Sequence, residues 1–170
     1  PILLMKNMKY VIGGAGNVAT NISNMGAKTT LICLSGKDSS SVTISKLLSE
    51  HKLIKNLSIK VPNFKTPIKT RFINNAEHLL RVDNENINFK LINKYKILII
   101  KKFKTEIEKN DVVVLSDYNK GLLDKDLIKK IIKIVLNLEW KKIFLNKILP
   151  SSQKSKAPTV KKTKWTGQRK

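Results

Sequence analysis

Residues 10–21 read YVIGGAGNVATN, and this stretch decides how the rest of the chain is interpreted. A short apolar run over residues 8–12 predicts a strand, and residues 16–25 predict a helix with Val18, Ile22 and Met25 on one face. Glycine has no Cβ, so it accepts positive φ and lets another molecule approach the backbone closely. The free N–H groups of a helix's first turn attract oxygen-rich ligands. The glycines therefore mark either a turn or a binding site.

Three interpretations of this glycine cluster are open from its residues alone. The first is a tight strand-to-helix turn with no ligand. The second is a dinucleotide fingerprint, because residues 14–19 fit G-x-G-x-x-A, although the acidic residue expected after the next strand comes late, at Asp38. The third is a turn that binds a sugar. A P-loop is excluded, because no Gly-Lys-Ser/Thr follows the cluster.

Composition bounds the class of protein. The 170 residues suffice for one ordinary domain with its own core. No run of about 18 uncharged apolar residues occurs, so no membrane span is predicted. Cys33 is the single cysteine, which excludes an internal disulfide and a cysteine-based zinc site and indicates a reducing, cytoplasmic location.

The formal net charge of +22 is the most unusual global property. Residues 147–170 contain eight Lys or Arg and no acid, so they are predicted to be a disordered basic tail that follows a domain over residues 1–146. In the domain the lysines stand on helix faces beside many Asn and Ile. We interpret them as compositional bias, with non-specific, salt-sensitive nucleic-acid binding as the alternative.

The order of elements predicts an α/β fold. Apolar runs at 29–34, 111–116 and 141–146 indicate buried parallel strands. Amphipathic patterns at 39–51, 87–109 and 124–138 indicate helices, and Ser39 to Ser41 are expected to cap the first of these three. Residues 57–83 alternate between apolar and polar side chains, which predicts an antiparallel lid. Ligands of such sheets lie beyond the carboxyl ends of the strands. Asp117 and Lys120 are placed there, unless Asp117 only caps a helix or forms a salt bridge.

Several motifs now occur in order, and together they resemble the ribokinase-like (PfkB) carbohydrate kinases. Within that family they look most like the kinase half of the bifunctional heptose 7-phosphate kinase/heptose 1-phosphate adenylyltransferases of lipopolysaccharide synthesis. The resemblance covers roughly residues 8–145 and implies a partial ribokinase-like sandwich with a β lid. The motifs are GGAGNVA at 13–19 with Asn21, Gly26-Ala27, Gly36-Lys37-Asp38, TPIKTR at 66–71, LRVD at 80–83 and VLSDYNKG at 114–121.

The resemblance implies transfer of the ATP γ-phosphoryl group, with Mg²⁺, to O1 of a heptose 7-phosphate. Sugar hydroxyls would be held by Gly13, Gly14 and Asn17. The sugar and its existing phosphate would lie near Lys69, Arg71 and Arg81, with Asp117 and Lys120 at the edge of the transfer region. Two copies would pair through the lid.

Two elements of the family pattern do not occur in these 170 residues, and one is the Thr-Pro-Asn-x-x-Glu element expected after the strand at 141–146. The Gly-Ala-Gly-Asp signature, which carries the catalytic base and an anion hole, is absent. The expectation is therefore a partial sugar kinase without activity on its own. A non-catalytic sugar-phosphate-binding module and, less favoured, a basic nucleic-acid-binding protein are the alternatives.

Overall fold

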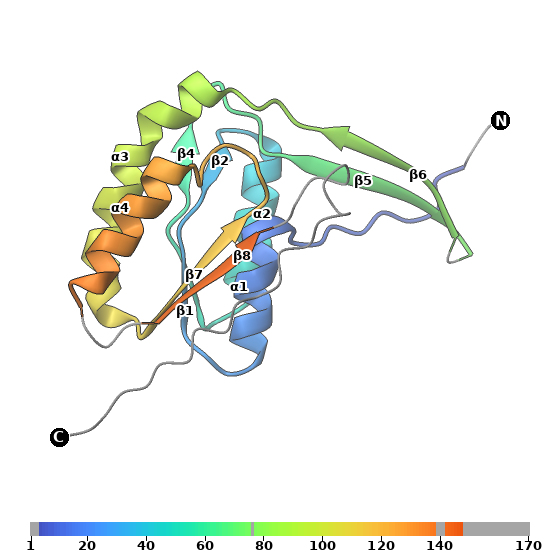
Figure 1. Cartoon of the computed structure of the whole chain (residues 1–170). Helices are drawn as coiled ribbons and strands as arrows, with labels where there is room; N and C mark the ends of the chain where they lie inside the picture. Colours follow the sequence, from blue (N-terminus) through green and yellow to red (C-terminus); the bar gives the residue numbers. More distant parts are fainter. Residues whose placement is uncertain (1–3, 76, 139–141, 148–170) are drawn as a thin grey trace, which may run out of the picture.

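Parallel strand pairs form the middle layer of the protein in the computed structural model, which describes residues 4–75, 77–138 and 142–147 (Figure 1). Strand β1 (Thr29–Leu31) pairs with β3 (Ile54–Asn56), and β2 (Leu34–Gly36) pairs with β4 (Ile59–Val61). Strand β7 (Val112–Asp117) pairs with β8 (Lys142–Lys147). All three pairs are parallel, as the apolar runs predict.

The strand expected over residues 29–34 is divided in two. Strands β1 and β2 are separated at Ile32 and Cys33, and β3 and β4 are separated at the matching place. Hydrogen bonds of 2.8 Å from Leu57 N to Leu31 O and from Ile59 N to Cys33 O carry the ladder across the break. The two pairs therefore make one irregular parallel ladder.

Helices cover both faces of this layer. Helix α1 (Gly14–Asn24) and helix α2 (Ser39–Ser49) lie on one side, where Ala19, Leu31 and Leu48 form a small core. Helix α3 (Phe89–Glu106), a 3-10 turn (Ile107–Lys109) and helix α4 (Lys125–Leu136) cover the other side. The larger core lies under them and consists of Ile59, Val61, Ile99, Ile107, Val113, Leu115, Leu127, Ile131 and Val135. The α/β sandwich expected from the sequence is confirmed.

Three helices begin at side-chain caps that satisfy otherwise unpaired first-turn N–H groups. Asp38 accepts from Ser41 N at 2.8 Å, Asn88 from Leu91 N at 2.9 Å and Asp124 from Leu127 N at 2.9 Å. The expectation that Ser39 to Ser41 cap α2 is wrong, because a carboxylate one residue earlier accepts the bond instead. On α4 the apolar spacing buries Leu127, Ile131 and Val135 as one stripe.

The antiparallel hairpin is shorter than residues 57–83. It consists of β5 (Ile68–Asn74) and β6 (Glu77–Asn84) and projects from the sandwich (Figure 1). Residues 59–61 belong to the parallel ladder instead, because β4 continues beside β2. Alternation of side chains in a strand does not reveal the direction of its partner.

The expected strand over residues 8–12 is also absent from the described chain. Residues 4–13 carry neither helix nor strand, and Tyr10 and Val11 are 61% and 71% exposed. A strand requires a neighbour for its backbone groups, and no strand pairs with this segment in the described structure. Helix α1 begins at Gly14, two residues earlier than expected.

Candidate functional site

The glycine turn leaves open space at the start of α1. Gly13 is the N-cap residue, and Gly14 has a φ of +56°, a left-handed conformation that side-chain-bearing residues seldom adopt. A Cβ placed on either glycine would meet no atom within 4 Å. The side chain of Asn17 is exposed in the first turn, where its backbone N–H donates to Gly13 O at 3.3 Å. The turn is therefore accessible rather than filled by other side chains.

The loop after β7 lies against this turn. Tyr118 donates its hydroxyl to Gly14 O at 3.3 Å, which joins residues 104 positions apart. Asp117 is buried, and its Oδ1 accepts from Asn119 N at 2.8 Å. Asn119 has a φ of +55°, so this bond stabilises a tight turn that ends at Lys120. The structure thus brings the Gly13–Asn17 turn and the Asp117–Lys120 loop together.

Charged side chains connect that loop to the base of the hairpin. Lys120 forms a close ion pair with Glu85, which follows β6. The second carboxylate oxygen of Glu85 lies 4.0 Å from Lys69 Nζ, and Lys69 donates to Asp83 at 2.5 Å. Arg81 Nε lies 3.0 Å from the other oxygen of Asp83. Cations and acids therefore alternate from the loop into the hairpin.

One face of the hairpin gathers positive charge. Lys69 stands opposite Asp83 across the strands, and Arg71 stands opposite Arg81. Like charges directly opposite each other destabilise a strand pair. Asp83 compensates Lys69 and Arg81, whereas Arg71 has no ion pair among the described residues. An anion beside the two arginines would relieve this repulsion.

Two carboxyl groups near the site are held ionised. The hydrogen bond from Lys69, helped by Arg81, keeps the pKa of Asp83 below its usual value. Burial alone would raise the pKa of Asp38, but hydrogen bonds from the Thr66 and Ser41 backbones and the Thr66 hydroxyl outweigh it and lower the pKa. Thr66 Oγ1 also accepts from Gly36 N at 2.8 Å. Asp38 thereby ties the end of β2 to the start of the hairpin.

Three residues of this arrangement were not among the predicted site residues: Glu85, Thr66 and Tyr118. Glu85 could have been found, because residues 81, 83 and 85 continue the period-two alternation along one strand face. Thr66 and Tyr118 belong to motifs quoted above, but only the fold shows what they contact. Asp38, considered above for a nucleotide ribose, here caps α2 and holds the hairpin.

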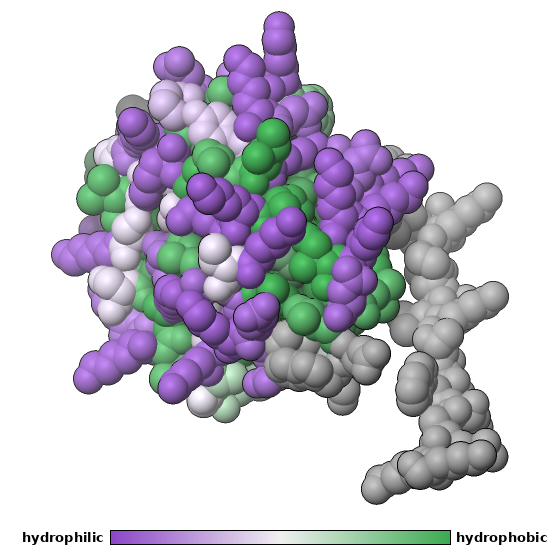
Figure 2. All heavy atoms as spheres, turned by 90° about the vertical axis from the view of Figure 1, so that its left-hand side faces the viewer, coloured by the Kyte–Doolittle hydropathy of each residue, from purple (hydrophilic) through white to green (hydrophobic). Residues whose placement is uncertain are grey.

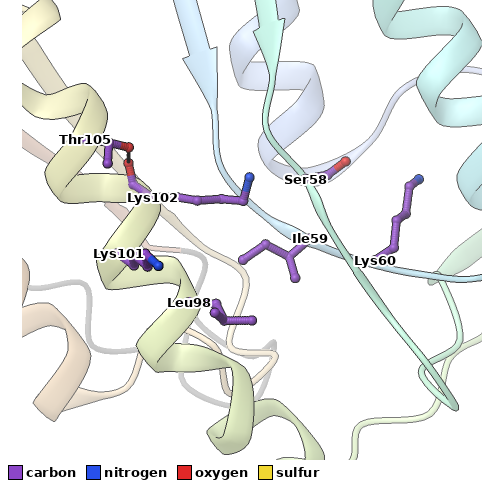
Figure 3. Close-up of a pocket in the computed structure, with 7 residues that line it drawn as sticks. All are labelled: Ser58, Ile59, Lys60, Leu98, Lys101, Lys102 and Thr105. Atoms are coloured by element: carbon purple, nitrogen blue, oxygen red, sulfur yellow. Dashed lines mark hydrogen bonds between the residues drawn. The ribbon is translucent and has the colours of Figure 1, made fainter.

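An open hollow lies elsewhere on the protein. It is open, has a volume of about 470 Å³, and is lined by residues of β4 and α3 and their flanks (Figure 3). None of the predicted site residues lines it. A second hollow of about 240 Å³ includes Asn17 in its lining, together with residues of the N-terminal segment and α2. In the described residues no group of three or more His, Cys, Asp or Glu is placed to hold a metal ion.

The chain belongs to the pfkB family of carbohydrate kinases, whose sequence pattern matches residues 1–163. The match continues past residue 146, and residues 148–170 lie outside the described structure.

Among curated relatives, bifunctional protein HldE of Rhodospirillum rubrum is 35% identical over 126 residues, and that of Nitrobacter winogradskyi is 32% identical over 134 residues. These alignments cover 73% and 78% of this chain but only 25% and 27% of the relatives. The chain thus spans about a quarter of the length of the relatives it matches. A solved structure from Thermotoga maritima, described as a possible 1-phosphofructokinase, superposes with a TM-score of 0.58 at 15% identity, covering 84% of this chain and 47% of that one.

Proposed function

We propose that this chain forms the sugar-phosphate-binding part of a carbohydrate kinase resembling heptose 7-phosphate kinase. The observation that carries the proposal is the convergence of an accessible glycine turn, the Asp117–Lys120 loop and the positive hairpin face. Polyol hydroxyls need backbone and carboxylate partners at close range, and a phosphate needs cations. The three features supply both at one end of the parallel sheet.

In this proposal the glycine turn holds the sugar. Gly13 and Gly14 let hydroxyls approach the backbone of α1, and the Asn17 amide offers both a donor and an acceptor. Asp117 borders the sugar and keeps the turn that presents Lys120. The existing phosphate of a heptose 7-phosphate lies against Lys69, Arg71 and Arg81. An arginine guanidinium binds a phosphate through two parallel hydrogen bonds.

The phosphoryl-transfer step itself is not assigned to these residues. ATP and Mg²⁺ belong to the reaction proposed by resemblance, in which the γ-phosphoryl group passes to O1 of the sugar during synthesis of a lipopolysaccharide core precursor. The described residues offer no cluster of metal ligands, so no residue is assigned to Mg²⁺ or to ATP. The 170 residues also contain no Gly-Ala-Gly-Asp signature. We therefore expect sugar-phosphate binding without measurable turnover by this chain alone.

Binding is tested by thermal unfolding with D-glycero-β-D-manno-heptose 7-phosphate, with the same heptose lacking phosphate, and with inorganic phosphate. At a concentration one hundred times Kd, a ligand that binds only the folded state adds about 2.7 kcal/mol of stability and raises Tm by about 5–10 °C. The heptose 7-phosphate is expected to give the largest shift. Equal shifts with all three compounds, or no shift with any, would contradict the proposal.

Two variants separate binding from folding. Gly13→Ala places a Cβ in open space at a φ of −111°, so stability is expected to stay within about 0.5 kcal/mol while the sugar loses room. Arg71→Gln is expected to weaken heptose 7-phosphate binding about tenfold and to leave binding of unphosphorylated heptose unchanged. Lys52→Gln, in the turn after α2, is the control. Unaltered sugar binding by Gly13→Ala would show that the turn is only a bend.

Pairing of two copies through the hairpin is a further part of the proposal. The face opposite the charged one carries Phe72, Leu80 and Val82, and the last two are 55% and 46% exposed. Burying such a strand face requires a partner surface. Analytical ultracentrifugation is expected to show a dimer that Leu80→Asp converts to a monomer. A monomeric wild-type protein at 100 μM would refute this.

A further inference from the structure

The positive charge of the protein is segregated to one of its two helix layers. Helices α1 and α2 contain one charged residue in total, Lys46. Helices α3 and α4 contain ten lysines against two acids, Glu106 and Asp126. A uniform compositional bias would place lysines on both layers alike. The interpretation of these lysines as bias alone is therefore insufficient.

Eight of these lysines are exposed and form what we call the lysine face. Figure 2 views the protein from the side of α3 and α4 and shows polar side chains projecting across this layer, with apolar side chains between them. None of the eight lies within ion-pairing distance of an acid in the described structure. The lysine face consists of Lys90, Lys94, Lys101, Lys104, Lys125, Lys129, Lys130 and Lys133.

Two of the nearby acids are already engaged by other lysines. Glu106 is paired with Lys55 at 2.7 Å, and Lys109 lies at 3.6 Å. Asp124, the cap of α4, is paired with Lys96 at 2.6 Å. These pairs neutralise lysines outside the lysine face, and within α3 and α4 they leave Asp126 as the acid beside its eight lysines.

The dimensions and chemistry of the lysine face fit a string of phosphates rather than one small anion. Lys90 and Lys104 are 14 residues apart, which is about 21 Å along a helix. A nucleic-acid strand carries a phosphate about every 3.4 Å of duplex axis, so about six phosphates pass along that length. The layer has no arginine, the side chain that most often reads guanine, and the rings of Tyr95 and Phe103 pack on the core. Phe89, at the start of α3, is 59% exposed, and stacking of a base on its ring would not depend on sequence.

We propose that the lysine face binds the phosphate backbone of nucleic acid without sequence preference. The face lies on the layer opposite α1, whose first turn belongs to the proposed sugar site. Lys101 and Lys102 border the open hollow between β4 and α3 (Figure 3). The ammonium of Lys60, on β4, donates instead to Ser41 O and Ser45 Oγ of α2. Binding is electrostatic and is set by the number of phosphates contacted.

The test uses the full chain, a fluorescein-labelled 20-base-pair DNA duplex and fluorescence anisotropy between 50 and 200 mM NaCl. The face variant carries Lys94→Gln, Lys101→Gln and Lys129→Gln. The control variant carries Lys28→Gln, Lys46→Gln and Lys52→Gln, three exposed lysines around α1 and α2 with the same change in net charge. Circular dichroism and the heptose 7-phosphate Tm shift confirm that each variant retains the fold and behaviour of the wild type.

The slope of log affinity against log NaCl concentration is about 0.9 per phosphate contacted, so losing three contacts reduces its magnitude by about 2.7. The fall in affinity between 50 and 200 mM NaCl is therefore expected to be about 40-fold smaller in the face variant than in the wild type. The control variant is expected to keep the wild-type slope. Equal slopes in the two variants, or no duplex binding at 50 mM NaCl, would overturn the proposal. So would tighter binding to vesicles of phosphatidylglycerol than to the duplex at equal phosphate concentration, which would identify a membrane surface as the partner.

Discussion

The carboxylate of Asp38 is expected to hold the hairpin onto the sandwich, and its removal gives the sharpest test of the fold. Its Oδ1 accepts from Ser41 N and from Thr66 Oγ1, and its Oδ2 accepts from Thr66 N, all at 2.8 Å. Thr66 is 5% exposed, so its donors would lose their partner away from bulk water. Asp38→Ala therefore removes a helix cap and a buried tether together.

The magnitude follows from the bonds. A lost cap costs about 1 kcal/mol, and each hydrogen bond to a charged acceptor contributes about 1.5–3 kcal/mol. Water entering the gap offsets part of the loss of the two Thr66 bonds. We expect Asp38→Ala to reduce the free energy of unfolding by about 3 kcal/mol, and Asp38→Asn by about half as much, because the amide keeps one acceptor oxygen.

Asp124→Ala is the matched control in urea denaturation followed by circular dichroism. Asp124 caps α4 in the same way and pairs besides with Lys96, but its own side chain is 43% exposed. It is expected to cost about 1 kcal/mol. A double-mutant cycle of Asp38→Ala with Thr66→Val should give a coupling of about 1 kcal/mol. If Asp38→Ala cost no more than Asp124→Ala, the tether would contribute nothing and the reasoning would fail.

Three further outcomes are expected. Gly36→Ala should lower the free energy of unfolding by at least about 2 kcal/mol in urea titration, because its Cβ would lie 2.3 Å from Phe64 O. Leu127→Ala should cost about 2–5 kcal/mol in the same assay, since the side chain is fully buried. Burial raises the pKa of Cys33 from 9.0 to about 11, so at pH 8 iodoacetamide should label the native thiol about 100-fold more slowly than the urea-unfolded thiol. Equal labelling rates would show that Cys33 is solvated.

Acid should destabilise the hairpin and its attachment to the sandwich by protonating Asp38 and Asp83. The pKa values of Asp38 and Asp83 are lower in the folded than in the unfolded chain, so their contribution is present above the unfolded value of 3.8 and is lost as pH falls through the folded values. As pH falls from 5 to 2.5, hydrogen exchange should show that the amides of β5 and β6 lose protection at a higher pH in the wild type than in Asp38→Asn. Identical pH profiles in the two proteins would contradict this.

The sequence predicts the helices and buried strands of the sandwich well, because their signals are local. Apolar spacing identifies α4 by Leu127, Ile131 and Val135, and the continuous run before Asp117 identifies β7. Pairing direction is not local. Residues 59–61 alternate like a hairpin strand, yet their hydrogen bonds go to a parallel neighbour 25 residues earlier in the chain. Residues 8–12 are apolar enough for a strand, but within the described ranges no strand pairs with them.

The residues of the candidate site also divide into those that local sequence patterns indicate and those whose contacts depend on the fold. Glycine spacing and the position of a turn after a strand indicate Gly13, Gly14 and Asp117 as candidates. The ion pair between Lys120 and Glu85 cannot be predicted from local sequence patterns, because the two residues are 35 positions apart. The distance between them depends on how the hairpin packs against the rest of the fold. The roles of these residues in binding a sugar phosphate stay predictions until binding is measured.

The sequence also predicts no membrane span, and none of the helices in the described ranges has the length and apolar character that crossing a bilayer requires.

Strand β7 shows what the alternation of a strand means for handling this protein. Val113 and Leu115 lie under the helices, whereas Val112 and Val114 face away and are 44% and 37% exposed. In dilute buffer these valines contact water. At the concentrations used for crystallisation these exposed valines are expected to contact other copies of the chain, so light scattering should rise steeply with concentration. The double variant Val112→Thr, Val114→Thr should keep the sample monodisperse.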